Sequence, residues 1–403
     1  MATIEPDRLM SDLRKLAEFG KYGAGVDRIA FSEPDLAARR WLRDRMEVAG
    51  LDAGIDRFGT VLGQAPGVSR AVLIGSHSDS VPRGGWLDGA LGVVFGLEIA
   101  RALRAEGLGN VDVVSFQDEE GSYIPCLGSK AFLGELDEAE LAAIEGPEGL
   151  PLDRAVARLA LAPDAFRMDG GRVTAFFEAH IEQGPRLEAA KVPIGVVTGI
   201  VGIRRFRVTT QGEANHAGTT PMEMRRDAGR ALIRFAAALP GLIAGNGSPD
   251  TVWNIGVMGF SPGAANVVPA EASMIVEMRD LDAATLDRLE QALLAAIRAE
   301  DGLSGVAMTA TPAGRVHPVA MDAGLQSLIA RAAQQRGIAF SPMPSGAGHD
   351  AMVMARALPS AMLFVPSIGG RSHDTTENTN EEDIVLGCQV LADAVAAHLR
   401  SVI

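Results

Sequence analysis

The stretch AVLIGSHSDSVPRGGWLDGALGVVFGLEIARALRAEG, residues 71–107, decides the fold of this chain. Its first four residues, Ala71–Ile74, are an uninterrupted apolar run, as expected of a strand buried on both faces. Its last part, Ala90–Gly107, has apolar residues at helical spacing and stops at a glycine. A histidine and two aspartates lie between the two parts. We therefore predict a strand followed by a helix, with ionisable side chains in the turn between them.

The same kind of apolar run returns three times along the chain. VDVVSF (111–116), VTAFFEA (173–179) and AMLFV (361–365) are short and nearly continuous, and helical stretches lie between them. Alternating strands and helices are typical of an α/β domain with a mixed, mostly parallel sheet flanked by helices. This domain is expected to contain most of the chain.

The middle of the chain has a different pattern. Strands with partial apolar alternation, suited to a sheet covered on one face, alternate there with helix-like stretches, at residues 204–214, 225–239, 271–280 and 282–300. We predict that residues 205–315 form a smaller α+β domain. This domain is inserted into a larger one, made of residues 1–204 and 316–403.

Composition excludes several classes of protein. The net charge of −14, from 51 acidic and 37 basic residues, and the absence of a Lys/Arg cluster argue against a nucleic-acid partner. The first residues lack the apolar core of a signal peptide, and no apolar run is long enough to predict a membrane span. Cys126 and Cys388 are far apart and give no disulfide framework. We expect a cytoplasmic protein.

Metal-binding residue types follow all four buried strands. They are His77 and Asp88 after the first strand, Asp118, Glu119 and Glu120 after the second, His180 after the third and His373 after the fourth. In open α/β sheets, ligands bind outside the carboxyl ends of the strands. Imidazole and carboxylate together suit zinc, manganese, cobalt or nickel, and five ligands exceed what one four-coordinate zinc needs. The pattern therefore favours two metal ions.

In such an arrangement Asp88 bridges the ions, and Asp79 orients the imidazole of His77. One of Glu119 and Glu120 is a ligand, while the other points into the cleft as a base. Taken singly, each of these residues is more typical of a capped turn or a solvated loop than of a metal site. Their shared position after strands is what indicates a metal site.

With these residues assembled, the chain resembles the amidase/hydantoinase/carbamoylase branch of the dinuclear-zinc aminoacylase and carboxypeptidase superfamily. This branch includes N-carbamoyl-L-amino acid hydrolases, allantoate and ureidoglycolate amidohydrolases and β-ureidopropionases. The resemblance runs nearly end to end. It rests on GSHSDSVPRGGWLDGALGV, DEEGSYIPCLGSKAF, HIEQGP, GVVTGIVG, GEANHAGTTPMEMRRDA, SGAGHDA and VPSIGGRSH.

The resemblance implies a role for each matching residue. The metal ligands would be His77, Asp88, Glu120, His180 and His373. Glu119 would be the general base, and Asp88 the bridge. Residues that bind substrate or its transition state would be Gln183, His216, Asn266, Arg279 and His349. The planar guanidinium of Arg279 suits a substrate carboxylate, although a surface ion pair with Asp280 or Asp282 would explain it equally well.

The resemblance also implies features of the whole molecule. The fold would be a metallopeptidase-like catalytic domain with an inserted lid and dimerisation domain that joins a homodimer and closes over the crevice. The peptide bond between Asp88 and Gly89 would be cis. Two segments depart from the pattern of relatives: Tyr123 and Ile124 replace an Arg-Phe pair, and DTTENTNEED (374–383) replaces a Ser/Pro-containing run. Both departures concern the choice of substrate.

The expected activity is hydrolysis of a linear C–N bond in a small N-carbamoyl acid, with release of ammonia and carbon dioxide. Two metal ions would activate water and polarise the carbonyl, Glu119 would move the proton, and His216 would stabilise the oxyanion. The alternatives are an amidohydrolase of allantoate or ureidoglycolate and a dipeptidase-like relative. A metal-free ureide-binding protein is a further alternative, but it would have lost a ligand or the base.

Overall fold

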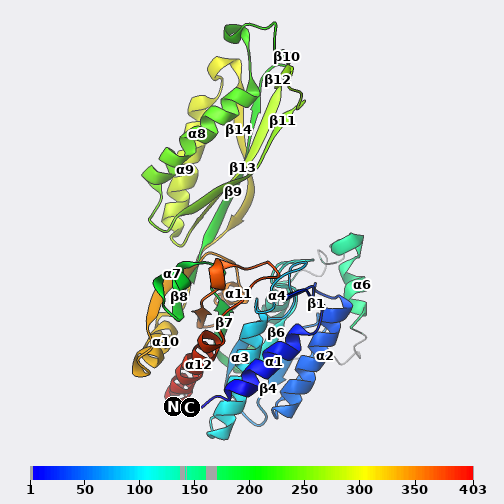
Figure 1. The fold of residues 1–403 in the computed structure, drawn as a ribbon, viewed down its shortest axis with the longest axis vertical. Helices are drawn as coiled ribbons and strands as arrows, with labels where there is room; N and C mark the ends of the chain where they lie inside the picture. The colour runs from blue at the N-terminus through cyan, green and yellow to red at the C-terminus, as the bar shows by residue number, and fades with distance from the viewer. Residues whose placement is uncertain (1–2, 137–140, 142, 160–169, 403) are drawn as a thin grey trace. The chain divides into compact units, whose positions relative to one another are not determined.

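The computed structural model describes residues 3–136, 141, 143–159 and 170–402. The chain divides into two compact units (Figure 1). Unit 1 is Met1–Thr198 together with Met321–Ile403, and unit 2 is Gly199–Ala320. Unit 2 extends a few residues beyond 205–315 at both ends.

Unit 1 contains a mixed sheet with the strand order β8-β17-β7-β5-β6-β4-β3, and β16 also pairs with β8. The central neighbours β17, β7, β5 and β6 are parallel, whereas β8 and β4 run antiparallel to the strands beside them. The strands are β3 (Asp52–Ile55), β4 (Val61–Gln64), β5 (Ala71–His77), β6 (Val111–Phe116), β7 (Val173–Ile181), β8 (Ile194–Ile200), β16 (Phe340–Ser345) and β17 (Ser360–Val365). A separate pair is β1 (Lys21–Tyr22) with β2 (Gly25–Val26).

The four strands predicted from apolar runs are the four parallel strands at the centre of this sheet. Every residue of β5, β6 and β17 is buried, and so is every residue of β7 except Thr174. The prediction of an α/β domain is therefore confirmed. Because the four strands are parallel neighbours, their carboxyl ends share one edge of the sheet.

Helix α3 (Ala90–Ala105) is the central helix of unit 1. It packs on β5, β6 and β7 and is itself covered by α1 and α12, so almost all of its residues are buried (Figure 1). Helix α2 begins at an N-cap, Ser32, whose side chain accepts a hydrogen bond from the Asp35 amide. The other helices are α1 (Pro6–Ala17), α2 (Glu33–Val48), α4 (Leu127–Leu133), α6 (Leu152–Ala157), α7 (Arg186–Ala190), α10 (Ala323–Gln335), α11 (Asp350–Met354) and α12 (Glu381–Val402).

Unit 2 is a four-stranded antiparallel sheet, ordered β11-β13-β9-β14, on which α8 and α9 pack. Burial alternates along β9 and β13, as predicted for strands covered on one face. Asp227 and Asp282 are the N-caps of the two helices. The elements are β9 (Gly202–Gln211), β10 (Asn215–His216), α8 (Ala228–Asn246), β11 (Val252–Ser261), β12 (Val267–Val268), β13 (Glu271–Asp280), α9 (Ala283–Glu300), β14 (Ala307–Val316) and β15 (Val319–Ala320).

Two helices, α8 and α12, are long and apolar enough to cross a membrane by length and composition alone. Neither helix is a continuous apolar run, and each meets this criterion through its average composition. Both helices instead bury one side in the protein: α8 packs on β9 and β13, and α12 packs on α3 and β17. A helix that covers a sheet in a globular core has the same composition as a short membrane span, so this finding is weak evidence for a membrane.

Candidate metal centre

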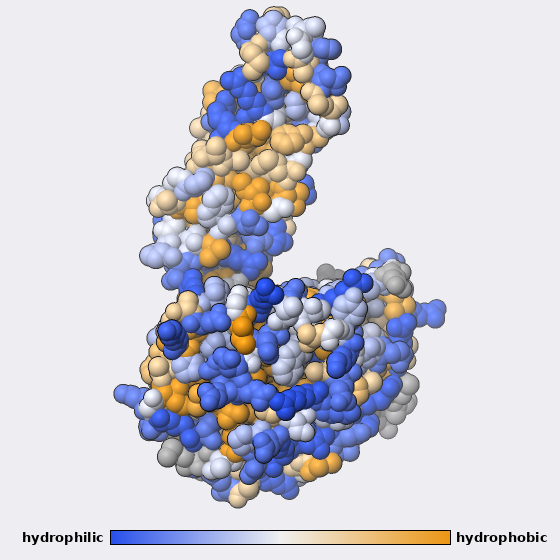
Figure 2. All heavy atoms as spheres, in the orientation of Figure 1, coloured by the Kyte–Doolittle hydropathy of each residue, from blue (hydrophilic) through white to orange (hydrophobic). Residues whose placement is uncertain are grey.

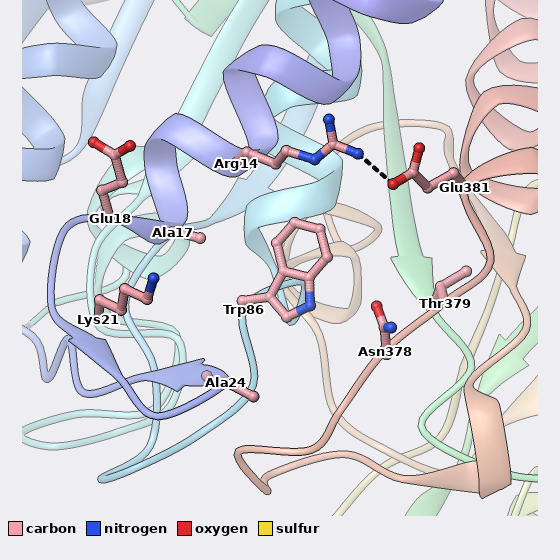
Figure 3. A pocket seen from close by; sticks show the side chains of 10 residues that line it. Arg14, Ala17, Glu18, Lys21, Ala24, Trp86, Asn378, Thr379 and Glu381 are labelled. Atoms are coloured by element: carbon pink, nitrogen blue, oxygen red, sulfur yellow. Dashed lines mark hydrogen bonds and ion pairs between the residues drawn. The ribbon is translucent and has the colours of Figure 1, made fainter.

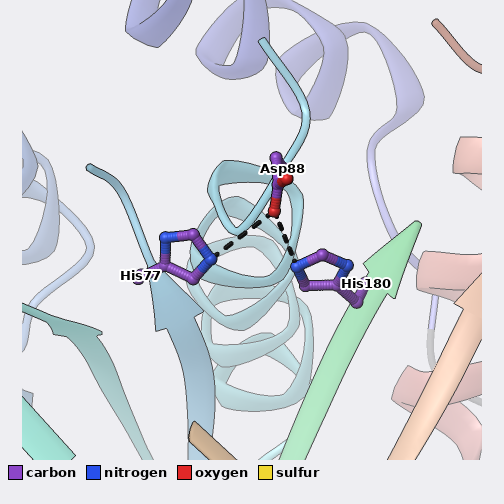
Figure 4. A group of neighbouring side chains, drawn as sticks. All are labelled: His77, Asp88 and His180. Atoms are coloured by element: carbon purple, nitrogen blue, oxygen red, sulfur yellow. Dashed lines mark ion pairs between the residues drawn. The ribbon is translucent and has the colours of Figure 1, made fainter. Parts of the chain in front are cut away.

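Three buried side chains, His77, Asp88 and His180, form the first metal-binding group (Figure 4). His77 is the last residue of β5, His180 lies near the end of the neighbouring parallel strand β7, and Asp88 lies two residues before α3. The Oδ1 atom of Asp88 is 3.6 Å from His77 Nε2 and 3.0 Å from His180 Nε2. The two strand ends and the start of the helix therefore direct three donor atoms to one point.

Asp88 also belongs to a second group, with Glu120 and His373. Its other oxygen, Oδ2, is 3.2 Å from His373 Nε2, and that nitrogen is 3.6 Å from Glu120 Oε1. Within each group the ligand atoms lie within 4.8 Å of one another. One carboxylate thus presents one oxygen to each group, which is the geometry that a bridging ligand needs.

The protonation of the two buried histidines fits a metal ion. The Nδ1 atom of His77 is 3.1 Å from the carbonyl oxygen of Asp79, and that of His180 is 2.9 Å from the carbonyl oxygen of Ile181. A carbonyl accepts a hydrogen bond, so each Nδ1 carries a proton, and each Nε2 is the ring atom that faces Asp88. Glu120 Oε1 is buried without a hydrogen-bond donor among the described residues. Both features suit a divalent cation.

Glu119 lies beside the first group but is not a member of either. Its Oε2 atom is 3.6 Å from His77 Nε2, and its Oε1 atom accepts a long contact, 4.0 Å, from the thiol of Cys126. Burial raises the pKa of Glu119 well above its usual value, and it also raises the pKa of Glu120, to about 7. A carboxylate with a raised pKa beside a metal group is suited to accept and release a proton.

Asp79 contacts His77 mainly through its main chain. Its carboxylate oxygen lies 3.7 Å from His77 Nδ1, farther than its carbonyl oxygen. The carboxylate instead accepts hydrogen bonds from the amides of Asp118 and Glu120, and it lies 3.5 Å from the guanidinium of buried Arg39. Asp79 therefore positions the loop that carries Glu119 and Glu120, while its carbonyl orients the imidazole.

The expected cis peptide bond between Asp88 and Gly89 is not found. In the described part of the chain the cis bond is Ser261–Pro262. Gly89 makes the turn into α3 with a φ of 64°, a conformation that glycine adopts at little cost. A Cβ atom at this position would lie 2.4 Å from the ring of His77, so the close approach also requires glycine.

Of the expected substrate-binding residues in unit 1, Gln183 and His349 both lie at the metal groups. The side-chain amide of Gln183 donates to Asp88 Oδ2 at 2.9 Å. The ring of His349 is buried, with its centroid 4.5 Å from that of His180. Burial, together with the charge of His180, lowers the pKa of His349 well below its usual value, so this imidazole is neutral.

Unit 2 brings together two of its three expected substrate-binding residues. Exposed His216 in β10 lies beside Asn266, because the carbonyl of Asn266 accepts a hydrogen bond from the Ala217 amide. The amides of Gly218 and Thr219 donate to His216 Nδ1, so Nε2 carries the proton and can donate.

Arg279 is elsewhere in unit 2. It lies near the end of β13, about 26 Å along the strand from Glu271, the first residue of that strand. Strand β12, which pairs with the strand of His216, comes just before Glu271 in the chain. The guanidinium of Arg279 pairs with Glu277, at 2.7 Å, a partner that the analysis of the sequence did not consider.

The structure adds Glu377, which the sequence did not single out. Its buried carboxylate accepts hydrogen bonds from the amides of Leu87 and Asp88, and the single hydroxyl hydrogen of Ser372 can be donated either to Glu377 Oε2, at 2.9 Å, or to Asp88 Oδ2, at 3.1 Å. A Cβ atom on Gly85 would lie 1.9 Å from the Glu377 carboxylate, so the chain before Asp88 is packed directly against it. Glu377 therefore fixes the position of the shared aspartate.

Arg39 and Glu178 are further buried charges near the centre that the analysis of the sequence missed. Arg39 pairs with Asp35 at 2.9 Å and donates to main-chain carbonyls at the end of β6. Glu178, in β7, accepts hydrogen bonds from the hydroxyl of Ser76 and the amide of Ala351. A glutamate inside an otherwise apolar strand is itself a signal, because glutamate is rarely buried without partners. Arg39 offers no such signal, since it lies in an ordinary helical pattern.

Replacing Glu377 by glutamine is expected to weaken metal binding by about 10–100-fold, as is typical for residues that support a ligand. The amide keeps the size of the side chain, but its NH2 group cannot accept hydrogen bonds. It therefore loses either the bonds from the Leu87 and Asp88 amides or the contact with the Ser372 hydroxyl. Metal affinity can be measured by competition with a chelator, and Glu382→Gln in the exposed first turn of α12 is the matched control. Equal affinities in both variants would remove Glu377 from the centre.

Two histidine and carboxylate groups that share one aspartate, at the carboxyl ends of parallel strands and with a further carboxylate beside them, define a metal-dependent hydrolase of the α/β class. Comparison with known proteins agrees with this definition. The chain belongs to peptidase family M20/M25/M40, whose sequence model matches residues 73–397. The resemblance found in the sequence is confirmed.

Similar proteins in this family are amidohydrolases. An N-carbamoyl-L-amino acid amidohydrolase of Geobacillus stearothermophilus is 34% identical over 97% of this chain and 98% of its own. An allantoate amidohydrolase of Bacillus subtilis is 33% identical over 94% of both chains. A crystal structure of an amidase of the hydantoinase/carbamoylase family from Burkholderia phymatum has a TM-score of 0.94 and 46% identity, covering 100% of this chain and 99% of that one. The protein is a metal-dependent amidohydrolase that acts on C–N bonds other than peptide bonds.

Proposed function

We propose that this protein hydrolyses N-carbamoyl-L-amino acids. Water adds to the ureido carbon, and the bond from this carbon to the terminal nitrogen breaks. Ammonia leaves, and the rest of the substrate remains as a carbamate. The carbamate then loses carbon dioxide to give the free amino acid. The observation that carries the proposal is the position of Asp88, one oxygen of which faces each of two metal-binding groups.

The ligands proposed for the two divalent ions divide between the groups. His77 and His180 would hold one ion, Glu120 and His373 would hold the other, and Asp88 would contribute an oxygen to each. Zinc is the proposed metal, with manganese, cobalt or nickel as alternatives, since all accept this donor set. When bound, such ions lower the pKa of water towards neutrality and polarise a carbonyl oxygen.

The chain's own residues are proposed to move the proton and hold the substrate. Glu119 accepts a proton from water and passes it to the leaving nitrogen. Gln183 and His349 line the substrate position. Because His349 is neutral, it contacts the substrate without taking up the proton that Glu119 transfers. The Nε2–H group of His216, with Asn266 beside it, donates to the developing oxyanion. Arg279 is the proposed clamp for the substrate carboxylate, in exchange for its pairing with Glu277.

Ammonia release tests the substrate. With metal-loaded protein, we expect turnover of N-carbamoyl-L-amino acids to exceed that of allantoate, ureidoglycolate and dipeptides by about 10-fold or more, the size of effect that one well-placed substrate contact supplies. An enzyme-coupled ammonia assay checks this, with ninhydrin detection for dipeptides. Activity only on allantoate would replace this substrate, and the absence of any metal after reconstitution would favour a ureide-binding protein.

We also propose that unit 2 joins two copies of the chain. Strand β11 is an edge of its sheet, and an edge strand presents unpaired backbone groups to another chain. Its Val257, Met258 and Phe260 side chains are exposed, and Figure 2 shows hydrophobic residues gathered on the face of unit 2 that it draws.

The location proposed for the protein is the cytoplasm. The two free cysteines, Cys126 and Cys388, fit a reducing environment of this kind.

The double variant Val257→Asp/Phe260→Asp is expected to be a monomer, because two new charges would be buried in the joined surface. Light scattering after size-exclusion chromatography measures the mass of each form, against the 42.2 kDa of one chain. Leu303→Asp, at another exposed hydrophobic residue of unit 2, is the control and should remain a dimer. A wild-type protein of one-chain mass would refute the dimer itself.

A further inference from the structure

A pocket of about 440 Å³ in unit 1, apart from the metal groups, lies between α1 and the start of α12 (Figure 3). Its two lining carboxylates are already in ion pairs, Glu18 with Lys15 and Glu381 with Arg14. In unit 2, by contrast, the guanidinium of Arg225 donates to main-chain carbonyls rather than to a carboxylate. A cation that is used in this way fixes the path of the backbone.

Arg225 holds the loop that begins at His216. Its Nε atom donates to the carbonyl of Thr220 at 2.9 Å, and its Nη2 atom donates to the carbonyl of Ala217. The planar guanidinium of arginine makes two such bonds at once in a fixed geometry, whereas lysine has a single nitrogen. One side chain therefore ties both ends of the turn between residues 217 and 220.

The same turn is joined to His216 by further hydrogen bonds. The amide and the hydroxyl of Thr220 donate to the His216 carbonyl, at 3.1 and 2.8 Å. The amides of Gly218 and Thr219 donate to His216 Nδ1, at 3.0 and 3.2 Å, which leaves the proton on Nε2. The direction of the imidazole therefore depends on the conformation of this turn.

Ala217 connects the turn to Asn266. Its amide donates to the Asn266 carbonyl at 2.9 Å, while its own carbonyl accepts from Arg225. His216, the residue before it, pairs with Val267 between β10 and β12. Because Ala217 is held at both of its main-chain groups, His216 is fixed beside Asn266, the other residue proposed to lie at the oxyanion.

Side-chain packing gives this loop little other support. His216 is exposed, and Arg225 itself is only half-buried. Among the described residues, the hydrophobic core of unit 2 includes none between Val208 and Ala228. A loop without buried apolar contacts is ordered by its hydrogen bonds, so the loss of two of them is expected to loosen it.

We propose that Arg225 is a positioning residue, which holds the Nε2–H group of His216 in place to donate to the oxyanion. This role rests on the proposed function, in which His216 makes that contact. A donor to an oxyanion is effective when it is already aligned, and its bond becomes strong only in the transition state. Arg225 therefore acts on kcat rather than on the affinity for the substrate.

The kinetic test compares Arg225→Met, Arg225→Lys and the control Arg226→Met, each loaded with zinc, on an N-carbamoyl-L-amino acid. Arg225→Met is expected to lower kcat about 10–100-fold with KM nearly unchanged, a smaller loss than the roughly 10²–10³-fold caused by removing an oxyanion donor. Lysine keeps the charge but not the fork, so its loss should be intermediate. Arg226, whose exposed guanidinium faces Glu213, should keep wild-type kinetics when replaced. A wild-type kcat in Arg225→Met, or an equal loss in Arg226→Met, would overturn the proposal.

A double-mutant cycle with His216→Ala separates positioning of the imidazole from general support of unit 2. If Arg225 acts through His216, Arg225→Met should lower kcat no further once the imidazole has been removed. If Arg225 acted independently, the two losses would multiply, and that result would overturn the proposal.

Hydrogen–deuterium exchange measured by mass spectrometry tests the same role without turnover. The amides of residues 217–220 are all hydrogen-bonded, and in Arg225→Met they should exchange about 10-fold faster or more, the effect expected from losing hydrogen bonds to a charged group. Arg226→Met should exchange as the wild type does. If no N-carbamoyl acid is hydrolysed, the proposed function fails, but this faster exchange would still establish that Arg225 holds the loop. Wild-type exchange in Arg225→Met would overturn the proposal even in an active enzyme.

Discussion

Glutamine in place of Glu119 is expected to abolish turnover, lowering kcat by about 10²–10⁴-fold, the range of general acid–base catalysis. The carboxylate lies beside His77 but outside both metal-binding groups, so the variant should keep its metal. The amide has nearly the same size and shape as the carboxylate, but it cannot accept and return a proton. Ammonia release and metal content should be measured on the same preparation.

The combination of lost turnover and retained metal is what distinguishes a base from a ligand. Glu120→Gln provides the comparison, because Glu120 belongs to the second group and its replacement should reduce the metal content as well. Glu47→Gln, at an exposed position of α2, controls for the loss of one charge and should change neither quantity. Near-normal turnover by the Glu119 variant would show that another group moves the proton.

The positions of the metal-binding groups could be predicted because they depend on topology. Parallel strands end at the same edge of a sheet, so His77 and His180 had to lie close together once β5 and β7 were predicted as buried parallel strands. The apolar runs identify these strands to within three residues at either end, because burial on both faces leaves few polar residues in them, such as Asp112 and Glu178. In unit 2 the alternation along β9 and β13 was equally informative.

Contacts that depend on the path of a loop could not be predicted in the same way. Glu377 contacts Leu87 and Asp88 across 289–290 residues of sequence, and its position is set by the turns around Ser367–Gly370 and Ser372. The orienting contact to His77 comes from the carbonyl of Asp79 rather than from its carboxylate, a difference that no side-chain pattern records. The turn at Gly89 likewise depends on the backbone conformation.

The second large effect is expected for Asp88→Asn, which should lose both metal ions and lower turnover at least about 100-fold, since even residues that only support a ligand contribute 10–100-fold. Its two oxygens face different groups, so one substitution weakens both. An amide has one oxygen and an NH2 group, and it cannot bridge two cations. Replacing a ligand of one group, as in Glu120→Gln, should by contrast leave the group of His77 and His180 able to hold one ion.

Metal stoichiometry after dialysis separates these outcomes. We expect two ions per chain in the wild type, about one in Glu120→Gln and fewer than one in Asp88→Asn. Near-identical circular dichroism spectra would show that the variants are folded, because Asp88 lies outside the regular strands and helices. If Asp88→Asn keeps two ions, or loses only as many as Glu120→Gln, the aspartate does not bridge, because a shared ligand must weaken both groups when it is removed.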